Sequence, residues 1–185
     1  MNSRTALSTT PQDIVTFWRN AGYERWYAKD DAFDQELRDR FMGTWEAARD
    51  GKLTAWQDSD DGTLALLIVL DQFPRNMFRN DARAFSTDAL ARGVAARAIA
   101  EGRDRRIEQG MRSFMYLPFE HSEDMADQER SIALFEPLGA DSLKWAVLHA
   151  DIIRKFGRFP HSNAVLGRAT TPEEAAFLDE GGFKG

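Results

Sequence analysis

Along most of the chain, apolar residues recur at the spacing of one helix face. Residues that are typical of helix ends precede and follow each such series. Phe33, Leu37, Phe41 and Trp45 follow one another in steps of four, which places them on one face of a helix. Asp30 precedes this series as a capping residue and Gly51 closes it. The same combination predicts helices from Thr10 to Gly22, from Ser86 or Thr87 to Gly102, around Met111, Phe114 and Met115, from about Ser122 to Phe135, from Leu143 to Phe156, and onward from the capping box at Thr171.

The longest apolar run, residues 64–70, fits either a buried strand or a buried helix. Ala and Leu outnumber β-branched residues in this run, and Asp60-Asp61-Gly62 before it resembles a helix start. We therefore predict a helix that is buried on all sides and that ends at Pro74.

These elements predict an all-α protein of about seven to nine helices without a sheet. No low-complexity linker divides the chain, so we expect a single helical domain over residues 10–180. Residues 1–9 are expected to form a loose N-terminal arm, and residues 181–185 a loose C-terminal tail.

A large apolar residue precedes proline at three places, at Phe73-Pro74, Leu117-Pro118 and Phe159-Pro160. The prolines are 44 and 42 residues apart, and a polar cluster follows each of them. Proline disfavours helical geometry at the residue before it, so each pair is expected to end a helix. Spacing of this kind is typical of stacked helical repeats, which would bring the three clusters to one edge of the stack. The alternative is that X-Pro pairs are common at helix ends and that the regular spacing of these three is a coincidence.

Three segments resemble signature motifs of a known family: LDQFPRNMFR (70–79), YLPFEHSEDMADQERS (116–131) and FGRFPHSNAVLGR (156–168). The chain resembles the bacterial domain-of-unknown-function family numbered nine hundred and twenty-four, from VTFW (15–18) to TTPEEAAFL (170–178). The resemblance implies a right-handed helical array similar to a tetratricopeptide-type superhelix. It implies no established activity.

Composition narrows the possible functions. The chain of 185 residues has no cysteine, which excludes thiol chemistry. Its net charge of -6 argues against nucleic-acid binding. The first residues lack the apolar core of a signal peptide, and no apolar run could span a bilayer, so a cytoplasmic protein without a membrane partner is expected. Gly-rich phosphate loops and the G-x-S-x-G elbow are absent from the sequence.

Histidines beside carboxylates are the candidate catalytic residues. Histidine exchanges a proton near neutral pH, and a carboxylate can fix its tautomer. The competing interpretation is that the acids around His121 form a helix-start network. No metal or other cofactor is expected, because HSED matches no known metal-ligand spacing. The candidates are Glu120, His121, Asp124 and His161.

Arginines and neighbouring polar residues are the candidate ligand-binding residues. Arginine binds carboxylate and phosphate groups in a bidentate manner. The competing interpretation is that these arginines pair with acids of the chain and hold helix ends together. The candidates are Arg75, Asn76, Arg112, His149, Arg158 and Asn163.

Three hypotheses for function follow. The first is a binding module that presents a polar pocket or groove to a small anionic molecule or a peptide. The second is an enzyme that uses a His–carboxylate pair as general acid and base. The third is an interaction protein whose motifs are purely structural. The sequence does not indicate the oligomeric state.

Overall fold

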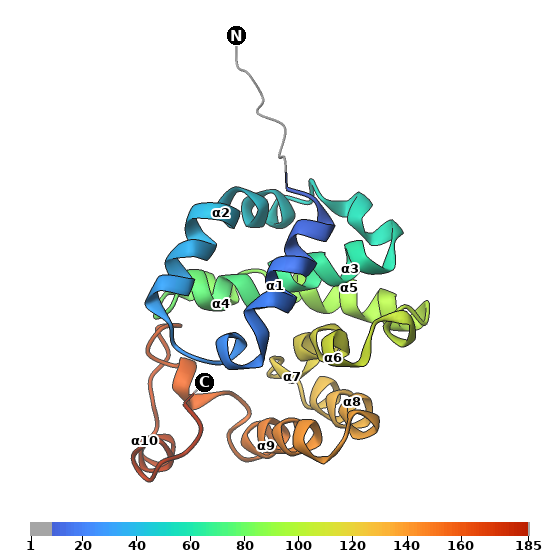
Figure 1. The fold of residues 1–185 in the computed structure, drawn as a ribbon. Helices are drawn as coiled ribbons and strands as arrows, with labels where there is room; N and C mark the ends of the chain where they lie inside the picture. The colour runs from blue at the N-terminus through green and yellow to red at the C-terminus, as the bar shows by residue number, and fades with distance from the viewer. Residues whose placement is uncertain (1–8, 185) are drawn as a thin grey trace. The chain divides into compact units, whose positions relative to one another are not determined.

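The computed structural model describes residues 9–184, which form helices and connecting turns without any strand (Figure 1). The all-α prediction is confirmed, whereas the right-handed superhelical arrangement stays a prediction. Residues 1–8 of the predicted N-terminal arm lie outside the described part of the chain. Over the described residues, no helix is both long and apolar enough to cross a lipid bilayer.

The chain folds into two compact units, and the single domain predicted over residues 10–180 stays a prediction. The N-terminal unit comprises Met1–Arg79 and Arg83–Met115, and the C-terminal unit comprises Asn80–Ala82 and Tyr116–Gly185. The helices of the N-terminal unit are α1 (Pro11–Trp26), α2 (Asp31–Arg49), α3 (Asp60–Leu67), α4 (Phe73–Met77), α5 (Asp88–Ala100) and α6 (Gln109–Arg112).

Capping residues set the helix ends of the N-terminal unit much as the sequence predicts. Thr10 and Asp13 form a reciprocal capping box at the start of α1, and the Asp30 side chain accepts from two backbone N–H groups at the start of α2. Gly22 interrupts α1 with φ 76°, as expected, although helical turns resume beyond it to Trp26. Gly51 adopts φ 72° after α2, which is the left-handed geometry that glycine accepts at a helix end.

Trp18 occupies the centre of an aromatic core in the N-terminal unit. Its ring is fully buried and its centroid lies 5.7 Å from that of Phe73, 6.0 Å from Phe33 and 5.8 Å from Phe114. These rings come from α1, α2, α4 and the turn after α6, so one residue links segments that are distant in sequence. Such tilted and edge-on pairs are the arrangements that aromatic rings prefer.

The apolar run 64–70 is helical and buried, as predicted, but the predicted end at Pro74 is wrong. A π-helical turn, Ile68–Gln72, follows α3 and leads directly into α4, in which Pro74 lies within the first turn. Pro74 has no N–H to donate to the Leu70 carbonyl four residues before it, and the Thr87 hydroxyl donates to that carbonyl instead.

The other two X-Pro pairs correct the prediction in the same way. Pro118 lies in the first turn of α7 (Leu117–Glu120), and Pro160 begins the short 3-10 helix Pro160–Ser162. The helix before Pro160 already ends at Gly157, which adopts φ 71°. Pro118 and Pro160 therefore lie in the first turns of short helices, because the fixed φ of proline suits such a turn. Pro74 instead lies in helical structure that continues from α3.

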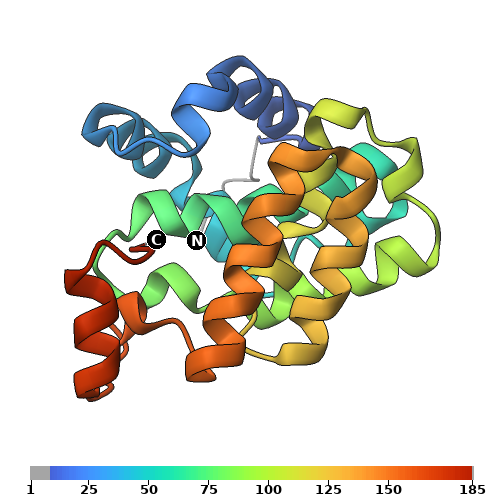
Figure 2. The same ribbon diagram turned by 90° about the horizontal axis from the view of Figure 1, so that it is seen from below.

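An antiparallel helix pair forms the body of the C-terminal unit. Helices α8 (Met125–Phe135) and α9 (Ala140–Phe156) lie side by side and are joined by a short turn at Gly139 (Figure 2). Both helices end where the sequence predicts, at Phe135 and Phe156, but α8 begins at Met125 after the cap Asp124 instead of near Ser122, and α9 begins at Ala140 instead of Leu143. A small apolar cluster centred on Ile152, Ile153 and Phe159 lies between α9 and the chain that follows it.

The last helix, α10 (Pro172–Asp179), begins with the capping box predicted at Thr171. Phe183 lies in the segment expected to be a loose tail, yet its ring contacts the rings of His149 and His161. The Phe183 side chain is therefore packed against these rings, while the loose tail over residues 181–185 stays a prediction. The sequence does contain a signal for this return of the chain, the Gly181-Gly182 pair after α10.

Candidate functional site

The polar clusters that follow the three prolines fall into different units. The cluster after Pro74 belongs to the N-terminal unit, and the clusters after Pro118 and Pro160 both belong to the C-terminal unit. A site shared by all three clusters stays a prediction. Within the C-terminal unit, Arg168 contacts both Glu123 of the second cluster and Asn163 of the third.

Arg75 pairs with two carboxylates of the N-terminal unit. Its Nη1 and Nη2 atoms donate to the Asp88 carboxylate at 2.8 and 3.0 Å, and Nη1 lies 3.3 Å from Oδ1 of the buried Asp71. Burial acts to lower the pKa of Arg75, but these carboxylates more than offset it, so the pKa is raised. The predicted anion-binding group is therefore already bound to anions of the chain.

Asn76 and Arg112 also contact groups of the chain itself. Asn76 donates to the buried Asp34 carboxylate at 2.9 Å, and Arg79 forms an ion pair with the same carboxylate. Arg112 donates to the backbone carbonyl of Ile107 at 3.0 Å. Within the described structure, these contacts join segments of the N-terminal unit.

A polar depression with a volume of about 220 Å³ lies elsewhere in the N-terminal unit. None of the candidate residues predicted from the sequence lines it. Arg19 pairs there with Glu108, and Arg106 pairs with Asp60. Its lining residues are Arg19, Asp61, Leu64, Arg106, Ile107 and Glu108.

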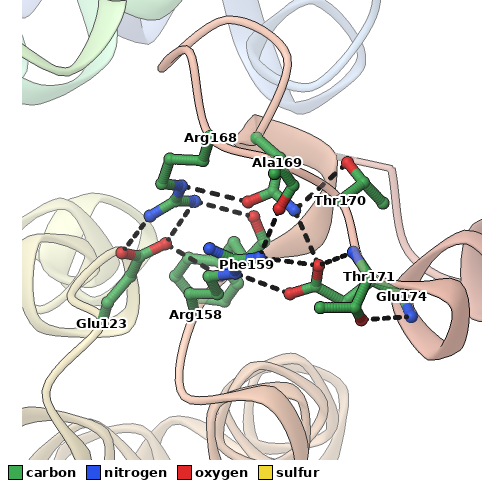
Figure 3. Close-up of polar contacts among 9 residues, drawn as sticks. Glu123, Arg158, Phe159, Arg168, Ala169, Thr170, Thr171 and Glu174 are labelled. Atoms are coloured by element: carbon green, nitrogen blue, oxygen red, sulfur yellow. Dashed lines mark hydrogen bonds and ion pairs between the residues drawn. The ribbon is translucent and has the colours of Figure 1, made fainter.

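Arg168 holds together the loop that follows α9. Its guanidinium donates to both oxygens of Glu123, at 2.7 and 3.0 Å, to the Phe159 carbonyl at 3.1 Å and to Asn163 Oδ1 at 3.0 Å (Figure 3). The Phe159 N–H also donates to Glu123. Burial acts to raise the pKa of Glu123, but the Arg168 and Phe159 donors more than offset it, so the pKa is lowered.

Arg158 and Asn163 contact Glu174 at the other end of the same network. Arg158 donates to both Glu174 oxygens at 2.6 and 2.8 Å, and Asn163 donates to one of them at 3.0 Å (Figure 3). The Arg158 guanidinium first, and the Thr171 N–H second, lower the pKa of Glu174 to about 2. This network joins the loop after α9 to the start of α10.

His121 and Asp124 lie at helix ends. The His121 N–H donates to the Leu117 carbonyl at 2.9 Å at the end of α7, and the Asp124 carboxylate accepts from the Ala126 N–H at 2.8 Å at the start of α8. Gln128 donates to the Glu120 and Ser122 carbonyls at 2.7 and 2.6 Å and thereby fixes the turn between these helices. These contacts favour the helix-start interpretation for Asp124; its catalytic role stays a prediction.

A buried His–carboxylate pair joins His149 to Glu120. His149 Nδ1 lies 2.8 Å from the Trp145 carbonyl oxygen and 3.4 Å from Glu120 Oε1. Both residues are buried, at 7% and 4% exposure. The sequence motif suggested His121 or His161 as the partner of Glu120, because His149 is distant from Glu120 in sequence and only packing of α7 on α9 brings them together.

The two histidines His149 and His161 contact the same two phenylalanine rings. The Phe159 centroid lies 5.5 Å from the His149 imidazole and 5.7 Å from that of His161. The corresponding distances to Phe183 are 4.7 and 5.3 Å. We name Glu120, His149, His161, Phe159 and Phe183 the histidine cluster. Within residues 9–184, no three His, Asp or Glu side chains come together as ligands for a metal ion.

The solved structure of a protein of unknown function, ATU0120 from Agrobacterium tumefaciens, is similar to this chain. The two chains are 47% identical and superpose with a TM-score of 0.90, over 92% of this chain and 97% of that one. No curated protein matches. The model of the family described as bacterial protein of unknown function (DUF924) matches residues 14–182. The chain therefore belongs to this family of bacterial proteins of unknown function.

Proposed function

We propose that the protein is an enzyme with an acid–base site at the histidine cluster, in which His149 takes a proton from a small bound molecule. The observation that carries the proposal is the position of His149 Nδ1 between two oxygen acceptors, the Trp145 carbonyl and the Glu120 carboxylate. The Trp145 contact decides which nitrogen of the neutral ring carries the hydrogen.

A backbone carbonyl oxygen can only accept a hydrogen bond, so Nδ1 must carry the hydrogen that it donates to Trp145. In neutral His149 the other nitrogen, Nε2, is then the unprotonated one and acts as the base. The position of the ring thus selects Nε2 for proton uptake.

Glu120 stabilises the protonated form of His149. When Nε2 takes up a proton the imidazole becomes a cation, and the Glu120 carboxylate 3.4 Å from Nδ1 lowers the energy of that cation. The effect is enlarged by burial, because both groups lie where water screens poorly. Gln128 fixes the backbone of Glu120 and acts as a positioning residue.

The arrangement favours this function over a module that binds anions through arginine. Arg75 and Arg158 each form bidentate contacts with a carboxylate of the chain, so an anionic ligand would have to displace an existing ion pair.

The test uses the side-chain nitrogen resonances of the chain's three histidines, each assigned by a single His→Gln substitution. We expect neutral His149 to be the tautomer protonated at Nδ1, and a set of small phenols, amides and carboxylic acids to include compounds that shift the His149 Nε2 signal. His121, at the end of α7, serves as the internal control and should not respond. A His149 protonated at Nε2 instead, or a set in which no compound moves its signals, would overturn the proposal.

A further inference from the structure

We infer that the ring of Phe183 occupies a subsite for a planar aromatic ring, and that the molecule on which the histidine cluster acts is a phenol-type compound that displaces it. This inference rests on the proposed function for its chemistry. The existence of the ring subsite depends only on the contacts of Phe183.

The surroundings of Phe183 have the geometry of an aromatic binding site. Its ring plane makes angles of 66° with the His149 imidazole and 85° with that of His161, at centroid distances of 4.7 and 5.3 Å. Trp145 lies 6.5 Å away at an angle of 52°. Three rings thus contact one phenyl group, the two imidazoles in the edge-on arrangement that aromatic pairs prefer and Trp145 in a tilted one.

The site opens to solvent on the side of Trp145. Trp145 is 43% exposed and Phe183 itself is only half-buried, whereas Phe159, which contacts the same two imidazoles, is 6% exposed. Phe159 therefore belongs to the interior of the unit, and Phe183 covers the outer side of the histidines. An incoming ring can replace Phe183 without disturbing Phe159.

Phe183 also reaches the site from a separable piece of chain. Gly181 adopts φ 88° and the Gly182 N–H donates to the Phe177 carbonyl at 2.9 Å, which is the glycine-ended turn that closes α10. A Cβ on Gly182 would lie 2.5 Å from the Phe177 oxygen, so only glycine fits this turn. Residues 182–184 have no helical hydrogen-bonding pattern, so release of Phe183 breaks no helix.

The neighbouring groups indicate which aromatic compounds fit. A ring in place of Phe183 has its centre 4.7 Å from the His149 imidazole, so a hydroxyl substituent on that ring is within reach of the base. Transfer of the phenolic proton to Nε2 yields a phenolate and an imidazolium, and the latter pairs with Glu120. A permanently anionic aromatic acid is a poorer fit, because Glu120 is a buried carboxylate.

The experiment compares the wild type with Phe183→Ala and with Phe177→Ala as the matched control. Phe177 is a second phenylalanine of the same region, but its ring contacts Phe156 instead of the histidines. The probes are 4-methylphenol, toluene and 4-methylcyclohexanol, and the readout is the carbon-bound proton signals of the imidazoles. Aromatic probes exert ring-current shifts on these signals, whereas the cyclohexanol cannot.

We expect both aromatic probes to shift His149 and His161 in Phe183→Ala, with an affinity roughly tenfold or more above that of the wild type, since Phe183 no longer competes for the site. The wild type should show the same shifts at higher probe concentration, together with movement of the Phe183 ring signals and none of Phe177. Phe177→Ala should bind the probes as the wild type does.

Equal affinity of the wild type and Phe183→Ala, or shifts confined to residues outside the histidine cluster, would overturn the inference. If Phe183→Ala does not fold, the same test is made with Phe183→Leu, whose probe affinity should also exceed that of the wild type. Movement of the Phe183 ring signals in the wild type on addition of the probes gives a second, independent test. Binding of toluene and 4-methylphenol with the same effect on the His149 Nε2 signal, so that the phenol hydroxyl forms no hydrogen bond with it, would support the ring subsite while the acid–base proposal fails.

Discussion

The Thr87 hydroxyl donates a hydrogen bond of 2.5 Å to the Leu70 carbonyl oxygen inside the N-terminal unit. Leu70 lies four residues before Pro74, which has no N–H and cannot supply the donor that a regular helix would place there. Thr87 is fully buried and also accepts from Trp45 Nε1 at 3.4 Å. A side chain 17 residues away thus supplies the donor that Pro74 lacks.

Substitution of Thr87 by valine should destabilise the protein by roughly 1–3 kcal/mol, because a buried carbonyl then loses its donor while side-chain volume is retained. Denaturant unfolding measures the change. Thr54→Val is the matched control, since the Thr54 hydroxyl donates to the Gly51 carbonyl at 2.7 Å in an exposed position where water can replace it. Equal losses in the two variants would contradict the argument.

Arg75 provides a second prediction. Arg75→Met should cost roughly 3–5 kcal/mol, because it removes the cation that lies 3.3 Å from the 1% exposed Asp71 carboxylate. Arg97→Met is the control: it breaks an exposed pair with Glu101 and should cost roughly 1 kcal/mol or less. A stable Arg75→Met variant, measured by thermal and denaturant unfolding, would restore Arg75 as a candidate ligand-binding residue.

Local sequence signals predicted the helices well because their causes are local. The capping residues Thr10, Asp30 and Thr171 accept hydrogen bonds from N–H groups two or three residues away, so a short window of sequence contains the whole interaction. The prolines misled the prediction because proline disfavours helical geometry in the residue before it and yet suits a helix start. Pro74 is accommodated through Thr87, a contact that no local window contains.

The histidine cluster was predictable only in part, because its contacts join residues that are distant in sequence. Glu120 and His161 stood out through their motifs, but the partner of Glu120 is His149, which comes from a different helix. Phe183 was assigned to a loose tail because composition alone does not show what a terminal side chain contacts. The Gly181-Gly182 pair before it was the available signal, since a glycine-ended turn returns the chain toward the helix it has left.

Arg168 provides a third prediction, which tests whether the shape of its guanidinium group, and not only its positive charge, stabilises the loop after α9. Arg168→Lys should cost roughly 1–3 kcal/mol, because lysine keeps the charge but cannot contact Glu123, Asn163 and the Phe159 carbonyl at once. Arg154→Lys is the control, since the Arg154–Asp151 pair is exposed on both sides and should contribute close to nothing. Similar free energies of unfolding for the two variants would show that charge alone holds the loop.

Glu174 provides the last prediction, a dependence of stability on pH. Its pKa in the folded protein is about 2, below the ordinary value of 4.5, so the unfolded chain binds the proton more readily than the folded one. The stabilisation from its pairing with Arg158 is therefore fully present above about pH 4.5 and is lost as the pH falls toward 2.

Denaturant unfolding of the wild type and Glu174→Gln between pH 7 and pH 2 measures this effect. The variant should be less stable than the wild type at pH 7, and the difference should shrink steadily below about pH 4.5. Glu173→Gln is the control, because Glu173 is the exposed neighbour of Glu174 in the same helical turn. A difference between wild type and Glu174→Gln that stays constant down to pH 2 would mean that the Arg158–Glu174 pair does not stabilise the fold through its charge.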